Sequence, residues 1–102
     1  MQITYEKNGG ELKIAIVGRL DTQTAPELEK TLEEHLPGAA CVTLDLAGLT
    51  YTSSAGLRVF LKARKAVQQQ EDLRLIHVCD DIMEILEMTG FTELMTIEQE
   101  SL

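Results

Sequence analysis

The amino-acid sequence predicts a single α/β domain, with a mixed sheet of four or five strands and three or four helices. Stretches of apolar and β-branched residues alternate along the chain with stretches whose apolar residues recur every three or four positions. This alternation is typical of strands that are connected by helices. The 102 residues have the size of one domain, and hydrophobic residues make up 44% of them, enough for one modest core. Residues 1–102 are therefore expected to form one unit.

The chain is expected to open with a β-hairpin. Residues 3–7 and 12–17 are rich in apolar and β-branched side chains. The second run alternates large apolar residues with Lys13 and Ala15, in the period of two that a half-buried strand requires. The run Asn8-Gly9-Gly10 between them is a turn signal, and Gly18 is expected to end the second strand.

A first helix is expected to begin at Thr24. Thr24 followed three residues later by Glu27 forms a capping-box pattern, and Pro26 is tolerated in the first helical turn. Leucines then recur every four positions on one face: Leu28, Leu32 and Leu36. Pro37-Gly38 is expected to stop this helix.

The second half of the chain is expected to alternate strand and helix twice more. The expected segments are a central strand at residues 41–46, a helix from near Ser54 to about Gln70, a strand at residues 73–78, a helix at residues 82–88 opened by Asp80-Asp81, and a short strand at residues 95–98. Gly90 is placed to end the third helix, and the last few residues are expected to be loose.

The charge and the cysteine content restrict the class of protein. Lys and Arg number 9 against 17 Asp and Glu, so the net charge is −8 and argues against a nucleic-acid or anionic-membrane partner. No apolar run approaches the ~20 residues that span a bilayer, and the first residues lack the pattern of a signal peptide. Two cysteines, Cys41 and Cys79, do not form a disulfide framework. We therefore expect a reduced, cytoplasmic protein without membrane insertion.

The turn from the central strand into the second helix carries the most informative residues. Thr52, Ser53 and Ser54 lie where the helix N-terminus offers free N–H groups and the positive end of its dipole. On spacing alone, the simpler interpretation is that Ser53 or Thr52 caps the helix. The other interpretation is a phosphorylatable serine, because a phosphate is tolerated at a helix N-terminus and would change a binding surface without unfolding the domain.

Three segments resemble the STAS family, the anti-sigma factor antagonists of bacteria. Residues 18–25 resemble its first signature, residues 44–58 with the serine turn resemble its second, and residues 88–91 resemble its closing element. The resemblance covers nearly the whole chain in the right order and implies one STAS-like domain. It also implies a partner-switching regulator that is not an enzyme, needs no cofactor and is a monomer when free.

The resemblance names partners by class. In this family an anti-sigma factor, which is also an ATP-binding serine kinase, binds the unphosphorylated antagonist and thereby releases its sigma factor. The kinase can phosphorylate the antagonist, which breaks the complex, and a serine phosphatase resets it. A matching switch in this chain would need one phosphoacceptor serine and a surface for the kinase.

The resemblance also assigns residues. Aligned through Gly56-Leu57, the phosphoacceptor position falls on Ser54. Ser53 is the second choice, since it stands where many members have Asp. Asp21 matches the acidic residue of the first signature, which in the family lies near the acceptor. The implied partner-binding residues are Asp21, Thr22, Thr52, Ser53, Ser54, Gly56, Leu57 and Arg58.

The expected second helix carries a cluster of basic residues in an otherwise acidic chain. They recur at positions that share a helix face: Arg58, Lys62 and Lys65, with Arg64 beside them. The simpler interpretation is a solvated face, and the alternative is a patch complementary to an acidic partner.

Other candidate sites have simpler explanations. His35 and His77 lack Cys or carboxylate at metal-ligand spacing, so no metal is expected. His35 is expected to be a cation near a helix C-terminus, and His77 a partly buried structural residue. The Asp80-Asp81 pair is ordinary in a first helical turn. Core packing is the expected role of three methionines: Met83, Met88 and Met95.

Two rival functions stay open on the sequence. One is a stand-alone STAS-like subunit of a larger complex, such as a membrane-transport or enzyme-regulating complex, in which the serine turn is only structural. The other is a nucleotide-binding module that uses the helix N-terminus as an anion site, although a Gly-x-x-x-x-Gly-Lys loop is absent. A serine hydrolase is disfavoured because no Gly-x-Ser-x-Gly elbow is present.

Overall fold

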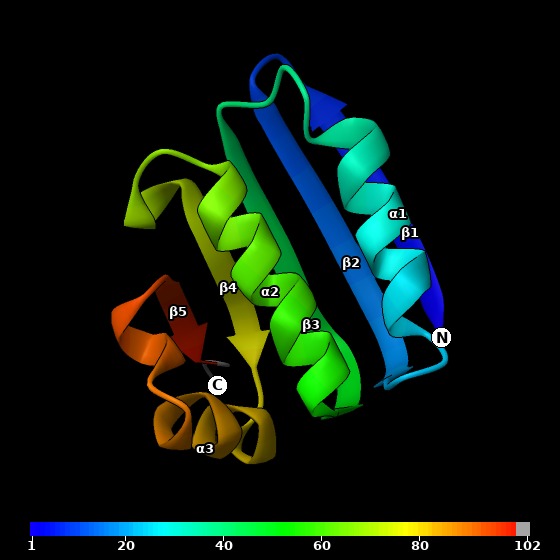
Figure 1. Cartoon of the computed structure of the whole chain (residues 1–102), viewed down its shortest axis with the longest axis vertical. Coiled ribbons are helices and arrows are strands. Elements are labelled where there is room, and N and C mark those ends of the chain that lie inside the picture. The colour runs from blue at the N-terminus through cyan, green and yellow to red at the C-terminus, as the bar shows by residue number, and fades with distance from the viewer. Residues whose placement is uncertain (100–102) are drawn as a thin grey trace.

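Five strands form one mixed sheet in the computed structural model, which describes residues 1–99 (Figure 1). The strands lie in chain order across the sheet, with β1 antiparallel to β2 and every other neighbouring pair parallel. Their bounds are β1 Gln2–Asn8, β2 Glu11–Leu20, β3 Cys41–Thr52, β4 Leu73–Val78 and β5 Thr96–Gln99. The predicted hairpin and the predicted mixed sheet are both confirmed, and β3 is the central strand.

Each pair of neighbouring parallel strands is connected through an α-helix. The helices are α1 Ala25–His35, α2 Ser54–Ala66 and α3 Asp80–Met88, with short 3₁₀ turns η1 Gln70–Asp72 and η2 Phe91–Glu93. Figure 1 shows α1 and α2 side by side over one face of the sheet, as right-handed crossovers between adjacent strands require. None of the helices in residues 1–99 has the length and apolarity that crossing a bilayer demands.

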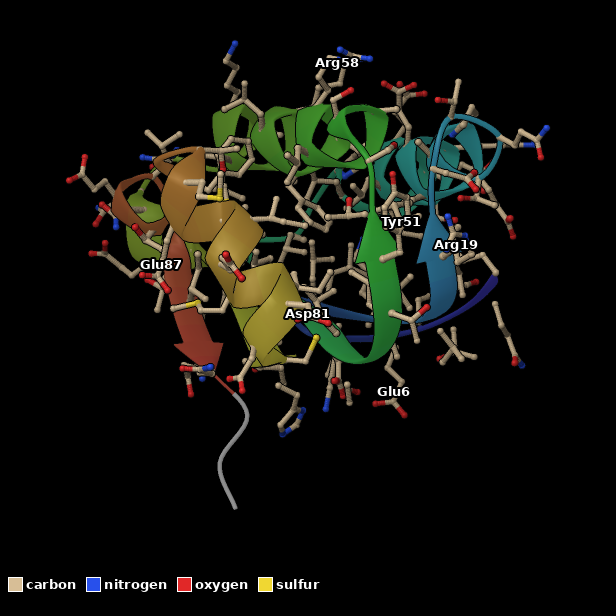
Figure 2. The ribbon with its side chains drawn as sticks, turned by 90° about the horizontal axis from the view of Figure 1, so that it is seen from below. Glu6, Arg19, Tyr51, Arg58, Asp81 and Glu87 are labelled. Carbon is tan, nitrogen blue, oxygen red and sulfur yellow. The ribbon has the colours of Figure 1, made fainter. Side chains whose placement is uncertain are left out.

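The hydrophobic core lies between the sheet and the helices. Alternate residues of β2 point to this side, so Leu12, Ile14 and Ile16 are buried while Glu11 and Lys13 are exposed. The core side chains of the other elements include Leu28 and Leu32 of α1, Leu44 and Leu46 of β3, Val59 and Phe60 of α2, Leu73 and Leu75 of β4, and Ile82 and Leu86 of α3. The opposite face of the sheet carries polar side chains such as that of Glu6 (Figure 2).

Strands β2 and β3 both continue beyond their predicted ends. Gly18 does not end β2, because the strand passes through it at φ +108° and stays paired with β3 as far as Leu20. The register shifts twice along this pairing, so the glycine marks an irregularity within the strand. Gly48 of β3 is the register partner of Val17, and a Cβ added to it would approach Val17 Cγ2 to 2.8 Å. Both glycines therefore let the two strands run on together.

Some helix predictions need correction. Helix α2 ends at Ala66 and not near Gln70, because Val67 is extended (φ −100°, ψ 161°) and the chain then forms η1. Met95 is buried, but Met88 is 79% exposed, so the expected core role is wrong for Met88. Gly90 follows α3 at φ +80° and confirms the predicted end of that helix. The expected loose end concerns residues 100–102, which lie outside the described residues.

Helix α2 approaches the end of β2 closely at Gly56. A Cβ on Gly56 would lie 2.7 Å from the side chain of Leu20 and closer still to the hydroxyl of Thr52. Alanine therefore has no room at this position unless α2 moves away from the strands.

We predict that Gly56→Ala lowers the free energy of unfolding by about 1–2 kcal/mol, since overpacking outweighs the intrinsic helix preference of alanine. Urea denaturation measures it. Gly10→Ala is the matched control, because its Cβ would meet Ala40 at an ordinary 3.4 Å, and a change below about 0.5 kcal/mol is expected there. Equal effects of the two substitutions would contradict the packing argument.

Candidate functional site

The candidate site lies at the end of the sheet where β2 and β3 lead into their helices. The backbone N–H of Ser53 donates to the carbonyl of Leu20 at 2.9 Å, which holds the two strand-to-helix turns side by side. Asp21 and Thr22 follow Leu20 directly, and Ser54 follows Ser53 as the first residue of α2. The structure thus brings together the first two signature segments, which are some thirty residues apart in the chain.

The turn between β2 and α1 is ordered by the carboxylate of Asp21. Its Oδ1 accepts hydrogen bonds from the backbone N–H groups of Gln23 at 3.0 Å and of Thr24 at 3.1 Å. The Thr24 hydroxyl accepts from the Asp21 N–H at 2.8 Å and donates to the carbonyl of Arg19 at 2.9 Å. The hydrogen bond from the Thr24 backbone is the main reason why the pKa of Asp21 lies below its usual range.

This geometry overturns the predicted capping box. Thr24 does occupy the N-cap position of α1, but its side chain makes no capping bond to the helix. The hydroxyl is turned back towards β2 and Asp21 instead, so Glu27 has no capping partner there. The expected partner residue Asp21 therefore has a structural duty of its own, which is to fix the loop that presents Thr22.

The two serines of the turn differ sharply in accessibility. Ser54 is exposed on the first turn of α2, whereas the Oγ of Ser53 is buried and has no hydrogen-bond partner. Ser53 stands at the N-cap position without a side-chain capping bond, and Thr52 is buried with its hydroxyl donating to the carbonyl of Ser53 at 3.2 Å. The expectation that Ser53 or Thr52 caps α2 through its side chain is therefore wrong.

The expected partner-binding residues fall into three groups, of which Asp21 and Ser53 form the first and are half-buried. Thr22, Ser54 and Arg58 are exposed and lie on or beside the first turns of α2. Thr52 and Gly56 are buried against the strand ends, and Leu57 is partly buried in the core. Thr52 and Gly56 can therefore affect a partner only by setting the position of α2.

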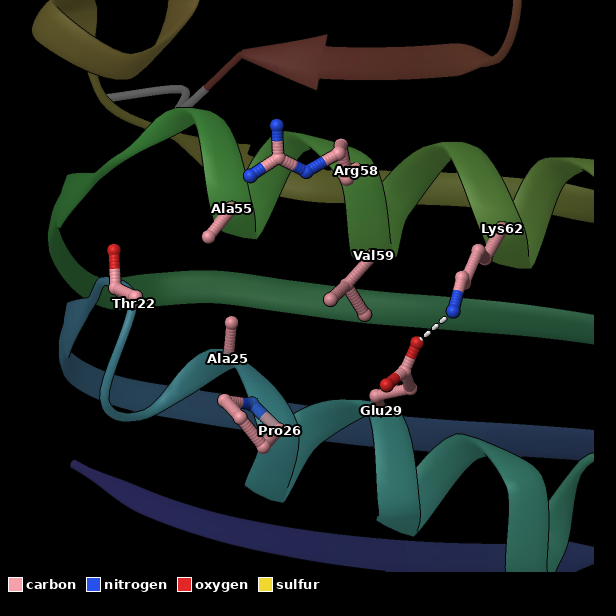
Figure 3. Close-up of a pocket in the computed structure, with 8 residues that line it drawn as sticks. All are labelled: Thr22, Ala25, Pro26, Glu29, Ala55, Arg58, Val59 and Lys62. Carbon is pink, nitrogen blue, oxygen red and sulfur yellow. Dashed lines mark hydrogen bonds and ion pairs between the residues drawn. The ribbon is translucent and has the colours of Figure 1, made fainter.

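A groove of about 240 Å³ runs between the N-terminal halves of α1 and α2. Figure 3 shows the residues that line it: Thr22, Ala25, Pro26, Glu29, Ala55, Arg58, Val59 and Lys62. Lys62 and Glu29 form an ion pair across it, and their hydrogen bond raises the pKa of Lys62. The guanidinium of Arg58 extends back along α2 above Ala55, towards the start of the helix (Figure 3).

The basic residues of α2 differ in whether their charges are paired within residues 1–99. Lys62 is paired with Glu29, and Arg64 donates through Nε to the carbonyl of Leu94 at 2.6 Å, which ties α2 to η2. Within residues 1–99, Arg58 and Lys65 have neither an ion pair nor a side-chain hydrogen bond. Arg58, Lys62 and Lys65 are exposed, as the solvated-face interpretation expects, and the patch for an acidic partner stays a prediction.

A cation–π pair at the same edge of the sheet was not expected from the sequence. The guanidinium of Arg19 lies 4.2 Å from the ring centroid of Tyr51, and the two residues are register partners in β2 and β3 (Figure 2). The sequence analysis missed the pair because it ended both strands before these residues. Tyr51 is 38% exposed, so the pair contributes to the surface near the serine turn.

The surroundings of His77 and Cys41 do not form a reactive or metal-binding site within residues 1–99. The prediction that His77 is partly buried is wrong, because its side chain is exposed. Its Nδ1 hydrogen-bonds Asp45 Oδ1 at 3.0 Å, and its backbone has a positive φ of +57°. Burial opposes ionisation of Asp45, but the bonds from His77 and the Ala47 N–H outweigh it and lower its pKa. Burial raises the pKa of the Cys41 thiol, which disfavours thiolate chemistry. Residues 1–99 contain no group of three His, Cys, Asp or Glu placed to hold a metal.

Comparisons with known proteins agree with this architecture. Residues 3–97 match the family model described as "Mlab, STAS domain". The anti-sigma-B factor antagonist of Listeria monocytogenes is 30% identical over 95 residues, which are 91% of this chain and 83% of that protein. The chain therefore belongs to the STAS-domain family of anti-sigma factor antagonists.

Solved structures of the family share the fold. An anti-sigma factor antagonist from Mycobacterium paratuberculosis has a TM-score of 0.85 at 17% identity, covering 99% of this chain and 86% of that one. The anti-sigma factor antagonist SpoIIAA has TM-scores of 0.72 in its unphosphorylated form and 0.73 in its phosphorylated form, at 10% and 13% identity. These matches cover 99% and 97% of this chain, and 90% and 93% of SpoIIAA.

Because the Ser53 hydroxyl makes no capping bond, its removal should change the stability of the fold only slightly. We expect Ser53→Ala to change the free energy of unfolding by less than about 0.5 kcal/mol, although removing a working N-cap costs about 0.5–2 kcal/mol. Thr24→Ala is the matched control, since it removes a bonded hydroxyl and is expected to cost about 1 kcal/mol. Chemical denaturation compares them, and an equal loss in both variants would contradict the assignment.

The turn at Asp21 predicts a pH dependence of stability. The pKa of Asp21 is lower in the folded state than in the unfolded state, so its ionised form stabilises the fold at pH values above about 3.9 and this contribution is lost as the pH falls through the folded-state pKa. Urea unfolding of wild type and Asp21→Asn should differ most at neutral pH and converge in acid. A difference that stays constant down to pH ~2.5 would contradict this assignment.

Proposed function

We propose that this protein is an anti-sigma factor antagonist that works by partner switching, with Ser54 as its phosphoacceptor. The observation that carries the proposal is the exposed Ser54 hydroxyl at the first residue of α2, in a chain whose relatives are anti-sigma factor antagonists. The proposed partner is an anti-sigma factor that is also an ATP-binding serine kinase. The protein is its ligand and its substrate, and is not itself an enzyme.

The difference between the two serines supports Ser54 as the acceptor. A kinase has to bring the attacking oxygen into line with the γ-phosphorus of ATP, so that oxygen must be accessible. Ser54 is exposed, whereas the Oγ of Ser53 is buried and would have to leave the turn first. Ser53 is therefore retained only as the second choice.

The proposed chemistry has two steps. Ser54 Oγ attacks the γ-phosphorus of ATP on the kinase, the bond from that phosphorus to the ADP oxygen breaks, and the hydroxyl proton passes to a base of the kinase. A serine phosphatase later uses water to cleave the monoester, which returns the hydroxyl and releases inorganic phosphate. Since ATP supplies the phosphate, we place the protein in the cytoplasm.

The location of Ser54 explains why phosphorylation would change binding and not folding. A phosphoserine carries a charge of about −1.5 to −2, and the free N–H groups and dipole at the start of α2 favour such a charge. The same charge would lie next to Ala55, which lines the groove together with Thr22 and Arg58, on the surface we assign to the partner. A partner that accommodates a neutral hydroxyl then meets a desolvated dianion and dissociates. The protein is proposed to be a monomer in its free state.

The proposal is tested with affinity baits in native lysate. We expect wild type and Ser54→Ala to retain a small ATP-binding serine kinase, Ser54→Asp to lose at least about tenfold of it, and wild type to receive phosphate at residue 54 when ATP is added. Gln68→Asp is the matched control, because it adds the same charge at an exposed position beyond the far end of α2. Mass spectrometry identifies the kinase and the phosphorylated residue.

Other outcomes would contradict the proposal. Phosphate at residue 53 would move the acceptor by one position. Equal recovery of subunits of a membrane-transport or enzyme complex by all baits, without phosphate, would instead favour a stand-alone STAS subunit whose serine turn is structural.

A further inference from the structure

We infer that Arg58 is the residue that responds to a phosphate on Ser54: its guanidinium pairs with the phosphate and is thereby withdrawn from the partner surface. This inference rests on the proposed function, because it takes Ser54 as the modified residue. It adds an attractive contact within the chain to the repulsion that the phosphate exerts on a partner.

The geometry of α2 places the two groups together. Ser54 and Arg58 are four residues apart on one helix, so they lie on the same face about one turn apart. Long side chains of a helix lean towards its N-terminus, and Arg58 does so here (Figure 3). Its guanidinium extends over Ala55, the residue that follows Ser54 in the chain (Figure 3).

Among the basic residues of α2, Arg58 is the unpaired cation closest to Ser54 along the helix. It is exposed, and it has no ion pair or side-chain hydrogen bond to any residue in the range 1–99. Lys62 and Arg64 are held by Glu29 and by the carbonyl of Leu94. Lys65 is free, but it lies seven residues further along α2, about 10 Å further from the serine.

The chemistry of the two groups suits a direct pair. A guanidinium presents parallel N–H donors that match two phosphate oxygens, and charge-assisted pairs of this kind are among the stronger hydrogen bonds of proteins. Arg58 and the first N–H groups of α2 would favour the phosphate dianion, and the ionised Asp21 in the adjacent turn would oppose it. Arg19 at the end of β2 lies over the ring of Tyr51. Phosphorylation would therefore both add negative charge and occupy a cation.

The test measures the phosphate itself and needs no partner or kinase. The full chain carrying phosphoserine at position 54, introduced by genetic encoding, is titrated by ³¹P NMR. We expect Arg58→Gln to raise the second pKa of the phosphate by about half a unit, Arg58→Lys to have a smaller effect, and Lys65→Gln to leave that pKa unchanged. A second readout is the Arg58 Nε–H resonance, which should be protected from exchange only in the phosphorylated chain.

The outcomes separate this inference from the proposed function. Equal titration curves for wild type and Arg58→Gln, or equal shifts in Arg58→Gln and Lys65→Gln, would overturn the pairing, whatever the kinase does. Phosphorylation of another residue by the native kinase would overturn the proposed function and leave the NMR result intact. Arg58 is exposed, so the variants should fold, and their amide spectra verify this.

Discussion

The position of the candidate site depends on the pairing of β2 with β3, which continues beyond Gly18 and Gly48. Because Gly18 and Gly48 allow the strands to stay paired, β2 reaches Leu20 and β3 reaches Thr52, which are register partners. Both strands therefore end at the same level of the sheet. The hydrogen bond from Ser53 to Leu20 closes this junction. If either strand ended earlier, the loops at Asp21 and Ser54 would separate.

At the same junction, some polar residues of the two turns stabilise the fold and others lie at the surface. Asp21 and Thr24 hydrogen-bond to each other through their side chains. Thr52 and Gly56 are buried where α2 packs on the strand ends. Ser54 and Arg58 are exposed, and within residues 1–99 their side chains have no hydrogen bond or ion pair. In the proposed function, phosphorylation of Ser54 at this junction would act as a binary signal by changing the charge of the surface while the fold stays in place.

Sequence patterns predicted the features that depend on local periodicity. The alternation in residues 12–17 and the leucine spacing in the first helix report burial directly, so the fold class and the element order could be predicted, and the family resemblance located the serine turn. Gly18 was interpreted as a strand end because local patterns do not reveal that a partner strand continues beside it. The Lys62–Glu29 pair joins two helices, and the buried Oγ of Ser53 depends on three-dimensional packing. Neither leaves a local sequence signal.

The helical setting of Ser54 bears on how a kinase could recognise it. Many protein kinases bind their substrates as extended, flexible peptides, but Ser54 is part of a folded helix whose first turn is fixed by Gly56 against β2. An enzyme that modifies it must accept a curved tertiary surface, with Thr22 and Arg58 arriving from two separate segments. Its specificity would then be written in the fold and not in a linear motif. A synthetic peptide of residues 46–58 would contain every residue of this turn, but it would lack the folded surface and would therefore be a poor substrate for such a kinase.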